Sequence, residues 1–176
     1  MQSRFIRGFT LLEVLVAVLI FSLGLLGLAG LLAVSVKTNH AAYLRTQATF
    51  LAEGMADRMR ANVLGLWNNS YNVTLTAALT TTTAIPTTCT AGACSYAEIA
   101  TRDLAVFEDQ LATFLPSPKT MIACTTTQTP TADQMLVLPP YSGTCEMLIQ
   151  WGDVSNLESK SATAPELITF DWVFQP

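Results

Sequence analysis

The chain has 176 residues, four cysteines, one histidine and a formal net charge of −4. Its length allows one compact domain beyond a membrane segment. The acidic balance argues against a nucleic-acid partner, because phosphate binding needs a basic patch and the sequence has no cluster of Lys or Arg. His40 is the only histidine, and the sequence has neither a phosphate-binding Gly loop nor a metal-ligand cluster. We therefore expect no enzyme, no cofactor and no metal.

The N-terminal part consists of a short basic leader and a long apolar stretch. Arg4 and Arg7 are the only charged side chains of residues 1–8, and Glu13 is the only charge in the 26 residues 11–36. A helix of that length reaches about 39 Å, which exceeds a hydrocarbon core of about 30 Å. The stretch is too long for a cleaved secretory signal, and the basic leader predicts a cytoplasmic N-terminus. These features predict a single-pass anchor with the rest of the chain outside.

The residues around this carboxylate indicate more than an anchor. Gly8 is followed by Phe9, and Glu13 lies four residues later. This arrangement resembles the class III signal of type IV prepilins. The resemblance implies that a prepilin peptidase cleaves between Gly8 and Phe9 and N-methylates Phe9. It also implies that Glu13 is an assembly carboxylate that pairs with the N-terminal ammonium of a neighbouring subunit. The alternative is a Glu that snorkels to the membrane surface without a partner.

The same resemblance implies three segments. Residues 1–8 are a leader peptide that is removed, residues 9–36 form the transmembrane and filament-core helix, and residues 37–176 form a periplasmic or extracellular head. After the leader, the chain carries seven basic and 13 acidic side chains, a net charge of −6.

The helix is predicted to continue beyond the membrane. Residues 37–62 contain no Pro, and apolar residues recur there at helical spacing, with Gly65 as the expected stop. The stripe consists of Leu44, Ala48, Leu51, Met55 and Met59. The charged residues Asp57, Arg58 and Arg60 either contact other subunits or form a solvated face, and the sequence leaves both readings open.

The remaining sequence predicts an α+β head. Residues 68–90 are rich in Thr and Asn and are predicted to be a surface connection, with an extended piece at residues 71–75. Ser95 and Glu98 form a capping box that starts a second helix, and Pro116 ends it. The apolar stripe of this helix is Ala100, Leu104, Phe107, Leu111 and Phe114. Four strands are predicted at residues 120–125, 135–138, 146–151 and 167–174. Resemblance to the type IV pilin fold implies that this antiparallel sheet packs on the outer half of the long helix.

All four cysteines follow the apolar stretch, so they lie on the translocated side. An even number of cysteines in an extracytoplasmic domain predicts two disulfides, for which three connectivities exist. Of these we favour Cys89–Cys94, which closes a small loop, together with Cys124–Cys145, which closes a longer one.

Several stretches resemble PilV-type minor pilins. They are residues 25–29, 45–48 and 51–62, then Leu115-Pro116 after the second helix, and the stretch from Cys145 to Trp151. The resemblance implies a minor pilin that primes pilus assembly and supports twitching motility and adhesion. The expected partners are the major pilin, other minor pilins, the prepilin peptidase and the inner-membrane assembly platform. The precursor is expected in the inner membrane, and the mature protein at or near the pilus tip. Two alternatives are a type II secretion pseudopilin and a tip adhesin with a ligand-binding head.

Overall fold

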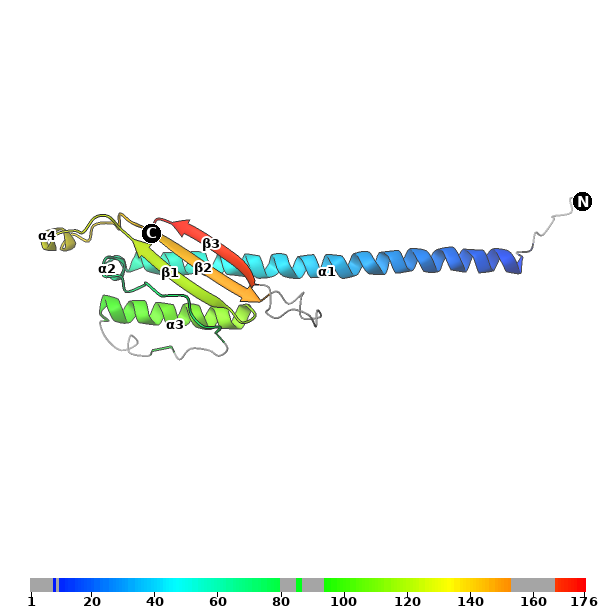
Figure 1. Ribbon diagram of the computed structural model, residues 1–176, viewed down its shortest axis with the longest axis horizontal. Coiled ribbons are helices and arrows are strands. Elements are labelled where there is room, and N and C mark those ends of the chain that lie inside the picture. The colour runs from blue at the N-terminus through cyan, green and yellow to red at the C-terminus, as the bar shows by residue number, and fades with distance from the viewer. Residues whose placement is uncertain (1–7, 9, 80–84, 87–93, 153–166) are drawn as a thin grey trace, which may run out of the picture. The chain divides into compact units, whose positions relative to one another are not determined.

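The computed structural model describes residues 8, 10–79, 85–86, 94–152 and 167–176. The chain divides into two compact units, Met1–His40 and Ala41–Pro176. The long helix α1 (Leu11–Ala61) contributes its residues up to His40 to the first unit and the remainder to the second. The other elements, α2, α3, β1, α4, β2 and β3 in chain order, all belong to the second unit (Figure 1).

In the first unit, α1 is apolar on every side. All its side chains from Leu11 to His40 are exposed, and α1 is the one helix of the described residues that is long and apolar enough to cross a membrane. The Ser22 hydroxyl donates a 2.8 Å hydrogen bond to the carbonyl of Leu19, so this polar group is satisfied within the helix. A polar group in hydrocarbon has no water to bond to, so it needs a hydrogen-bond partner within the protein.

In the second unit, α1 is buried on one side only. Leu44, Ala48, Met55 and Met59 of the predicted stripe are buried, while Leu51 is half-buried at its edge. Ala52 and Ala56 are buried as well. The predicted stripe is thus confirmed, with the two additional alanines lying nearer its centre than Leu51. Both alanines belong to the core that α1 shares with α3 and the sheet.

The long helix ends earlier than the sequence predicts. α1 stops at Ala61, and the side chain of Asn62 accepts a 3.2 Å hydrogen bond from the amide of Gly65 to cap α2 (Val63–Trp67). Gly65 therefore lies inside α2, and its prediction as the stop was wrong. A Cβ at Gly65 would lie 2.6 Å from the Asn62 amide nitrogen and 3.0 Å from the Tyr71 ring. A glycine is needed at position 65 because the Asn62 and Tyr71 side chains pack closely against it, and not because the helix ends there.

A buried polar network joins the end of α1 to α3 (Tyr96–Phe114). The Asn62 amide nitrogen donates to the Tyr71 hydroxyl at 3.0 Å and to the carbonyl of Tyr96 at 2.8 Å. The Tyr71 hydroxyl in turn donates to the Asp103 carboxylate at 2.8 Å. Burial, followed by the bond to Asp103, raises the pKa of Tyr71 above its usual value, so the neutral hydroxyl is the form that the fold stabilises. The network thereby fixes α2 and the segment after it against α3.

The charged residues of the outer helix have different environments. Arg58 is half-buried and donates to the Gln110 side chain of α3 at 3.5 Å, so it faces the interior of the unit. Asp57 and Arg60 are exposed and form an ion pair at 2.8 Å. A single exposed pair of this kind contributes little to stability. Asp57 and Arg60 are exposed within the subunit, which fits either reading, whereas Arg58 is not part of a solvated face.

The second helix matches its prediction closely. The Ser95 amide donates to the Glu98 carboxylate at 2.8 Å, and the Glu98 amide donates to the Ser95 hydroxyl at 3.3 Å, which is the predicted capping box. The backbone bond from Ser95, followed by its hydroxyl, lowers the pKa of Glu98. The helix ends at Phe114, just before Leu115 and Pro116. In the stripe, Ala100, Phe107 and Leu111 are buried, Leu104 is half-buried and Phe114 is 45% exposed.

Three strands form an antiparallel sheet in the order β1 (Lys119–Thr125), β2 (Thr144–Gly152), β3 (Leu167–Phe174). Burial alternates along β1 and β2, and their inward side chains join the core built from α1 and α3. In Figure 1 the sheet lies against the outer part of α1, with α3 running beside that helix. The predicted extended piece is present at Val73, which pairs with Ile122 on the outer edge of β1. The second unit is therefore an α+β domain.

One of the four predicted strands was wrong. Met135 is the last residue of a short helix, α4 (Ala132–Met135), and the chain continues from Leu136 as a turn. The Thr131 and Gln134 side chains form a second capping box, and Leu138 adopts a φ of 49° before Pro139. These local bonds, together with the two prolines, favour a turn over a strand. The other three strands are confirmed.

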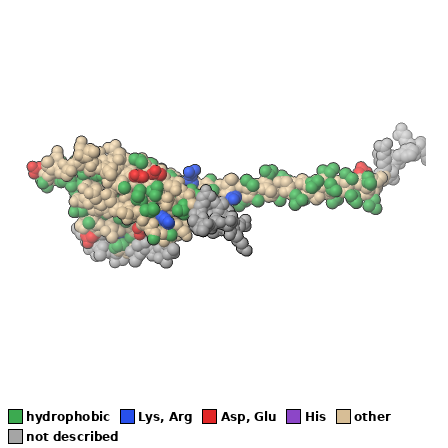
Figure 2. Space-filling model, viewed as in Figure 1, with side chains coloured by type: hydrophobic (Ala, Val, Ile, Leu, Met, Phe, Trp, Pro, Cys, Tyr) green, Lys and Arg blue, Asp and Glu red, His purple; other side chains and the backbone are tan. Residues whose placement is uncertain are grey.

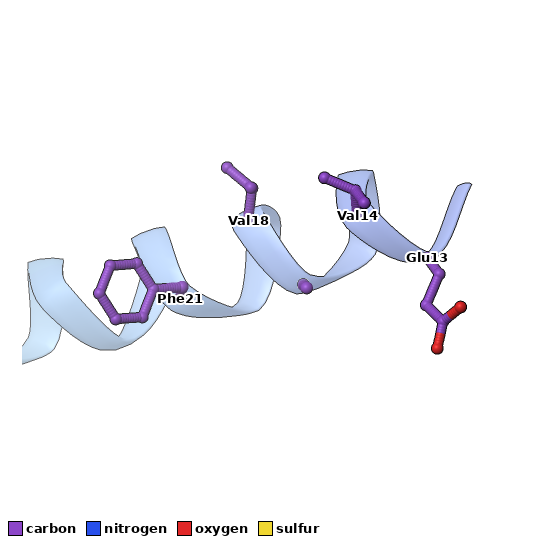
Figure 3. Close-up of a pocket in the computed structure, with 5 residues that line it drawn as sticks. Glu13, Val14, Val18 and Phe21 are labelled. Atoms are coloured by element: carbon purple, nitrogen blue, oxygen red, sulfur yellow. The ribbon is translucent and has the colours of Figure 1, made fainter. Parts of the chain in front are cut away.

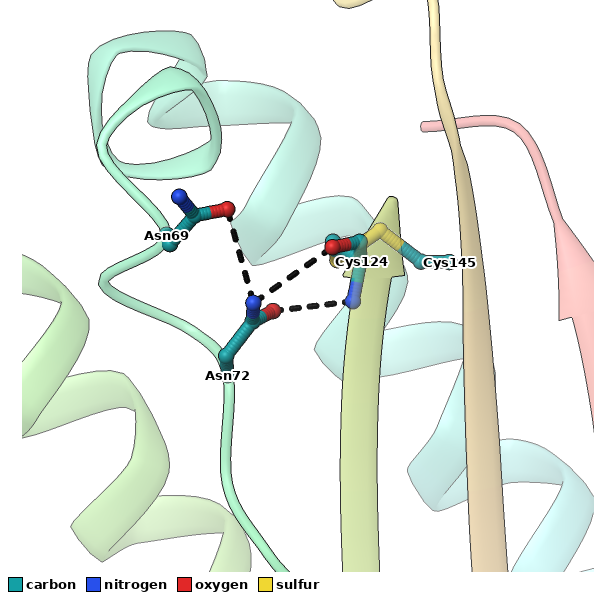
Figure 4. Close-up of a disulfide and its surroundings, with 4 residues drawn as sticks. All are labelled: Asn69, Asn72, Cys124 and Cys145. Atoms are coloured by element: carbon teal, nitrogen blue, oxygen red, sulfur yellow. Dashed lines mark hydrogen bonds between the residues drawn. A yellow bond between two sulfur atoms is a disulfide. The ribbon is translucent and has the colours of Figure 1, made fainter. Parts of the chain in front are cut away.

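A disulfide joins the sheet ends where β1 finishes and β2 begins. Cys124 and Cys145 lie opposite one another in the strand register and are bonded, which is the pairing favoured from the sequence. Figure 4 shows Asn72 beside this bridge: its side chain accepts from the Cys124 amide at 2.8 Å and donates to the Cys124 carbonyl at 3.4 Å. Cys94 is also disulfide-bonded. Cys89, its expected partner, lies outside the described residues.

We expect Asn62→Ala to lower the free energy of unfolding of the second unit by about 3 kcal/mol, because it leaves several buried polar groups without their partner. Chemical denaturation of the full-length protein in detergent, followed by tryptophan fluorescence, measures this change. Thr74→Ala, at an exposed position, is the control and should stay within about 0.5 kcal/mol of the parent. Equal effects of the two substitutions would contradict the role of the network.

Candidate functional site

The candidate site is the N-terminal end of α1. The Glu13 amide donates to the Thr10 carbonyl at 3.1 Å and to the Thr10 hydroxyl at 3.3 Å, and the Val14 amide donates to the same carbonyl at 3.3 Å. Thr10 thus caps the helix, as Thr does at many helix starts. The sequence analysis missed this residue, although a Thr three positions before a Glu is the recognised pattern of a capping box. The cap fixes the start of α1 at Leu11 and places Glu13 in the first turn.

Glu13 is exposed, and Figure 3 shows its carboxylate extending away from Val14 and Val18. Together with Ala17 and Phe21, these residues line an open hollow along the helix surface. A negative charge in the first turn is favourable beside the free amides of a helix N-terminus, which is worth about 0.3–1 kcal/mol. Glu13 therefore has a local role in α1, and any role between subunits has to be separated from it.

Gly8 lies just before the cap and is exposed. A Cβ built on Gly8 meets no described atom within 4 Å, and its φ is not positive. Neither close packing nor a left-handed backbone therefore requires a glycine here. Phe9, the residue on the other side of the expected cleavage point, lies outside the described residues. The geometry leaves Gly8 accessible to an external enzyme.

The helix that follows this site is apolar over its whole circumference. Figure 2 shows hydrophobic side chains along this part of α1, and Glu13 is the only acidic residue between Leu11 and Val36. His40 is exposed on α1. Among the described residues, no group of three or more His, Cys, Asp or Glu lies close enough to hold a metal ion.

Two family profiles match the chain in adjoining regions. Residues 3–29 match the prokaryotic N-terminal methylation motif, and residues 30–105 match the type IV pilin Tt1218 family. The first match begins before Gly8 and runs through the Thr10 cap into the apolar part of α1, and the second continues through the outer part of α1 into α3. Searches of curated proteins and of solved structures gave no significant match.

The two matches and the architecture define the class of this protein. A long N-terminal helix followed by a small antiparallel sheet is the type IV pilin fold, and the chain is a type IV prepilin. Members of this family are structural subunits of pili. Membership implies processing by a prepilin peptidase, association with the inner membrane through the apolar helix, and incorporation into a pilus.

Proposed function

We propose that this prepilin is a PilV-type minor pilin that primes pilus assembly together with other minor pilins. The observation that carries its role as an assembling subunit is that Gly8 and Glu13 are both exposed at the capped start of an apolar helix. Support for the minor-pilin class comes from residues 45–62, which resemble those proteins. We propose no catalytic activity and no cofactor for it.

In this proposal the peptidase cleaves between Gly8 and Phe9, and Phe9 becomes the N-methylated terminus. Residues 1–8 are the leader, residues 9–36 serve as the membrane and filament-core helix, and residues 37–176 form the head. The accessible, unconstrained Gly8 supports this assignment, because no contact in the described structure accounts for a glycine there. A peptidase that admits only a small side chain before the cleaved bond would account for it.

Glu13 is proposed as the assembly carboxylate. Among closely packed apolar helices, an isolated carboxylate is costly, because few water molecules remain to solvate it. The N-terminal ammonium of Phe9 on a neighbouring subunit provides an opposite charge. Such a pair contributes to register and direction more dependably than to net stability. The hollow beside Glu13, lined by Val14, Val18 and Phe21, supplies an apolar surface against which a neighbouring helix packs.

The partners proposed are the major pilin, the other minor pilins and the inner-membrane assembly platform. The precursor pool lies in the inner membrane with a periplasmic head, and the assembled protein lies at or near the pilus tip. Support for twitching motility and adhesion follows from a role in starting the fibre.

Replacing Gly8 with Leu should block processing, because the longer side chain lies next to the bond to be cut. In the native host, the product should accumulate as a slower-migrating precursor on an immunoblot and be absent from sheared pili. Gly54→Ala is the matched control, since a Cβ at Gly54 also meets open space and the substitution lies far along the helix. Normal maturation of the Gly8→Leu protein would refute the proposed cleavage site.

Replacing Glu13 with Gln should leave membrane insertion and leader cleavage intact and reduce the amount of the protein in sheared pili by about tenfold or more. Removal of the charge costs the helix only about 0.3–1 kcal/mol, too little to unwind α1. Quantitative immunoblots of membrane and pilus fractions measure both effects. Ser22→Ala, which removes a hydroxyl bonded within the same helix, is the control and should incorporate normally. Normal incorporation of Glu13→Gln would rule out the assembly role.

Deletion of the gene should abolish or strongly reduce twitching motility and leave protein secretion normal. This result separates the minor pilin from a type II secretion pseudopilin, which has the same signal and long helix. Loss of secretion with normal twitching would favour the pseudopilin. Assembled, retractile pili that fail only in attachment would favour the tip adhesin.

A further inference from the structure

The loop between β1 and β2 exposes three consecutive apolar side chains. It comprises residues 126–143 and contains α4, followed by Leu136, Val137 and Leu138, whose side chains are 83%, 77% and 55% exposed. Soluble surfaces expose single apolar residues routinely, but a contiguous apolar group marks an interaction site more often. Figure 1 places α4 and this turn at one end of the second unit, beyond the ends of the strands.

The base of this loop is fixed at three points. The Cys124–Cys145 disulfide joins the strands from which the loop leaves and returns. The indole nitrogen of Trp67 donates to the carbonyl of Pro139 at 3.0 Å, which ties the loop to α2. Tyr141 is buried and packs edge-to-face on Trp67, with ring centroids 4.9 Å apart. These three contacts fix the conformation of the loop where it joins the rest of the domain.

The tip itself is also organised. The Thr131 amide donates to the Gln134 side chain at 2.8 Å, which closes the capping box of α4. The amides of the three apolar residues donate to carbonyls within the turn, Leu136 to Asp133 at 3.3 Å, Val137 to Gln134 at 3.2 Å and Leu138 to Met135 at 3.3 Å. Their backbone N–H groups are thus hydrogen-bonded, while their side chains are exposed to solvent.

Leu138 has a φ of 49°, a left-handed conformation that a leucine rarely adopts. This conformation costs about 1–2 kcal/mol for a residue with a Cβ. Strained backbone of this kind persists where its surroundings over-determine it, and it is concentrated at binding sites. The turn thus keeps a strained backbone while it holds its apolar side chains in water, and a partner that covers these side chains would gain the free energy of their burial.

We propose that Leu136, Val137 and Leu138 form an apolar anchor that inserts into an apolar recess with a basic rim on the head of a different pilin subunit. This inference rests on the proposed function, in which the protein assembles with other pilins. We refer to these three residues as the apolar anchor.

The charge of the loop and the small area of the apolar anchor favour another pilin subunit as the partner. Asp133 is the only charged residue of the loop, so an anionic lipid surface offers no attraction. A second copy of the chain has the same acidic excess, which opposes self-association. Three side chains cover much less than the about 800 Å² that each partner buries in an independent interface. A subunit already held by its helix in the same assembly needs no such area, because its effective concentration is high.

The test places a photo-crosslinking amino acid at position 137 of the full-length protein in the native host during pilus production. Position 173 is the matched control, because Val173 is an exposed valine, 61% accessible, on β3 of the same unit. Antibodies against this protein and against each of the other pilins identify the products. We expect a product with another pilin at least tenfold stronger from position 137 than from position 173. A product containing only this chain, only lipid or no pilin at all would overturn the inference.

A second arm uses the double substitution Leu136→Ser and Val137→Ser, with Val173→Ser as control. Both side chains are exposed, so the melting temperature should not change, while incorporation into sheared pili should fall about tenfold relative to the control, the size expected when a central interface contact is lost. Normal incorporation of the double variant overturns the anchor and leaves the proposed function intact. Absence of the unmodified protein from sheared pili overturns the proposed function and the anchor together.

Discussion

The helix α1 has to be stable both in the hydrocarbon of a membrane and at the surface of a domain in water. The rest of the structure depends on how its sequence satisfies these two requirements. Hydrocarbon offers no hydrogen bonds, so a spanning segment has to satisfy its backbone internally, and a helix does so. Between Leu11 and Val36 the side chains are exposed and, apart from Glu13 and two serines, carry no charged or polar group. From Leu44 to Met59 the same helix buries a single stripe, and its exposed side carries polar and charged residues together with Phe50. The change of pattern along one element separates the membrane part from the part that organises the domain.

The domain depends in turn on how the helix is terminated. Asn62 interrupts α1, caps α2 and donates to both Tyr71 and the carbonyl of Tyr96. A buried amide that serves three partners is costly to disturb, since every lost bond leaves an unsatisfied group. This polar junction ties the end of α1 to α3 beside the core between α1, α3 and the sheet. The apolar contacts of that core supply most of the stabilisation.

The Cys124–Cys145 disulfide stabilises the conformation of the loop that carries the apolar anchor. Cys124 and Cys145 already face one another in the strand register, so the covalent bond adds a constraint at the base of the loop that follows. With Trp67 and Tyr141 packed at the same base, the loop has a defined conformation even though its tip carries exposed apolar side chains. Pre-ordering a contact surface in this way lowers the entropy that is lost on binding.

The sequence by itself determined the elements whose signals are local: the apolar stretch, the segment from Gly8 to Glu13, the stripe from Leu44 to Met59, the Ser95 capping box and three strands. It favoured the pairing of Cys124 with Cys145 among three connectivities, and the structure shows that pairing. Hydrophobic periodicity and side-chain caps act over a few residues, so they can be recognised without knowledge of the fold. Only the tertiary structure decided that Gly65 lies within a helix, that Arg58 faces α3, and that residues 136–138 form an exposed turn rather than a strand. The three outcomes have different physical reasons. Arg58 faces α3 because it bonds to Gln110, 52 residues away in the sequence, and such a contact exists only once the chain has packed. Gly65 is required by the close approach of Asn62 and Tyr71, and residues 136–138 form a turn through capping bonds of α4 that compete with the apolar run's strand pattern.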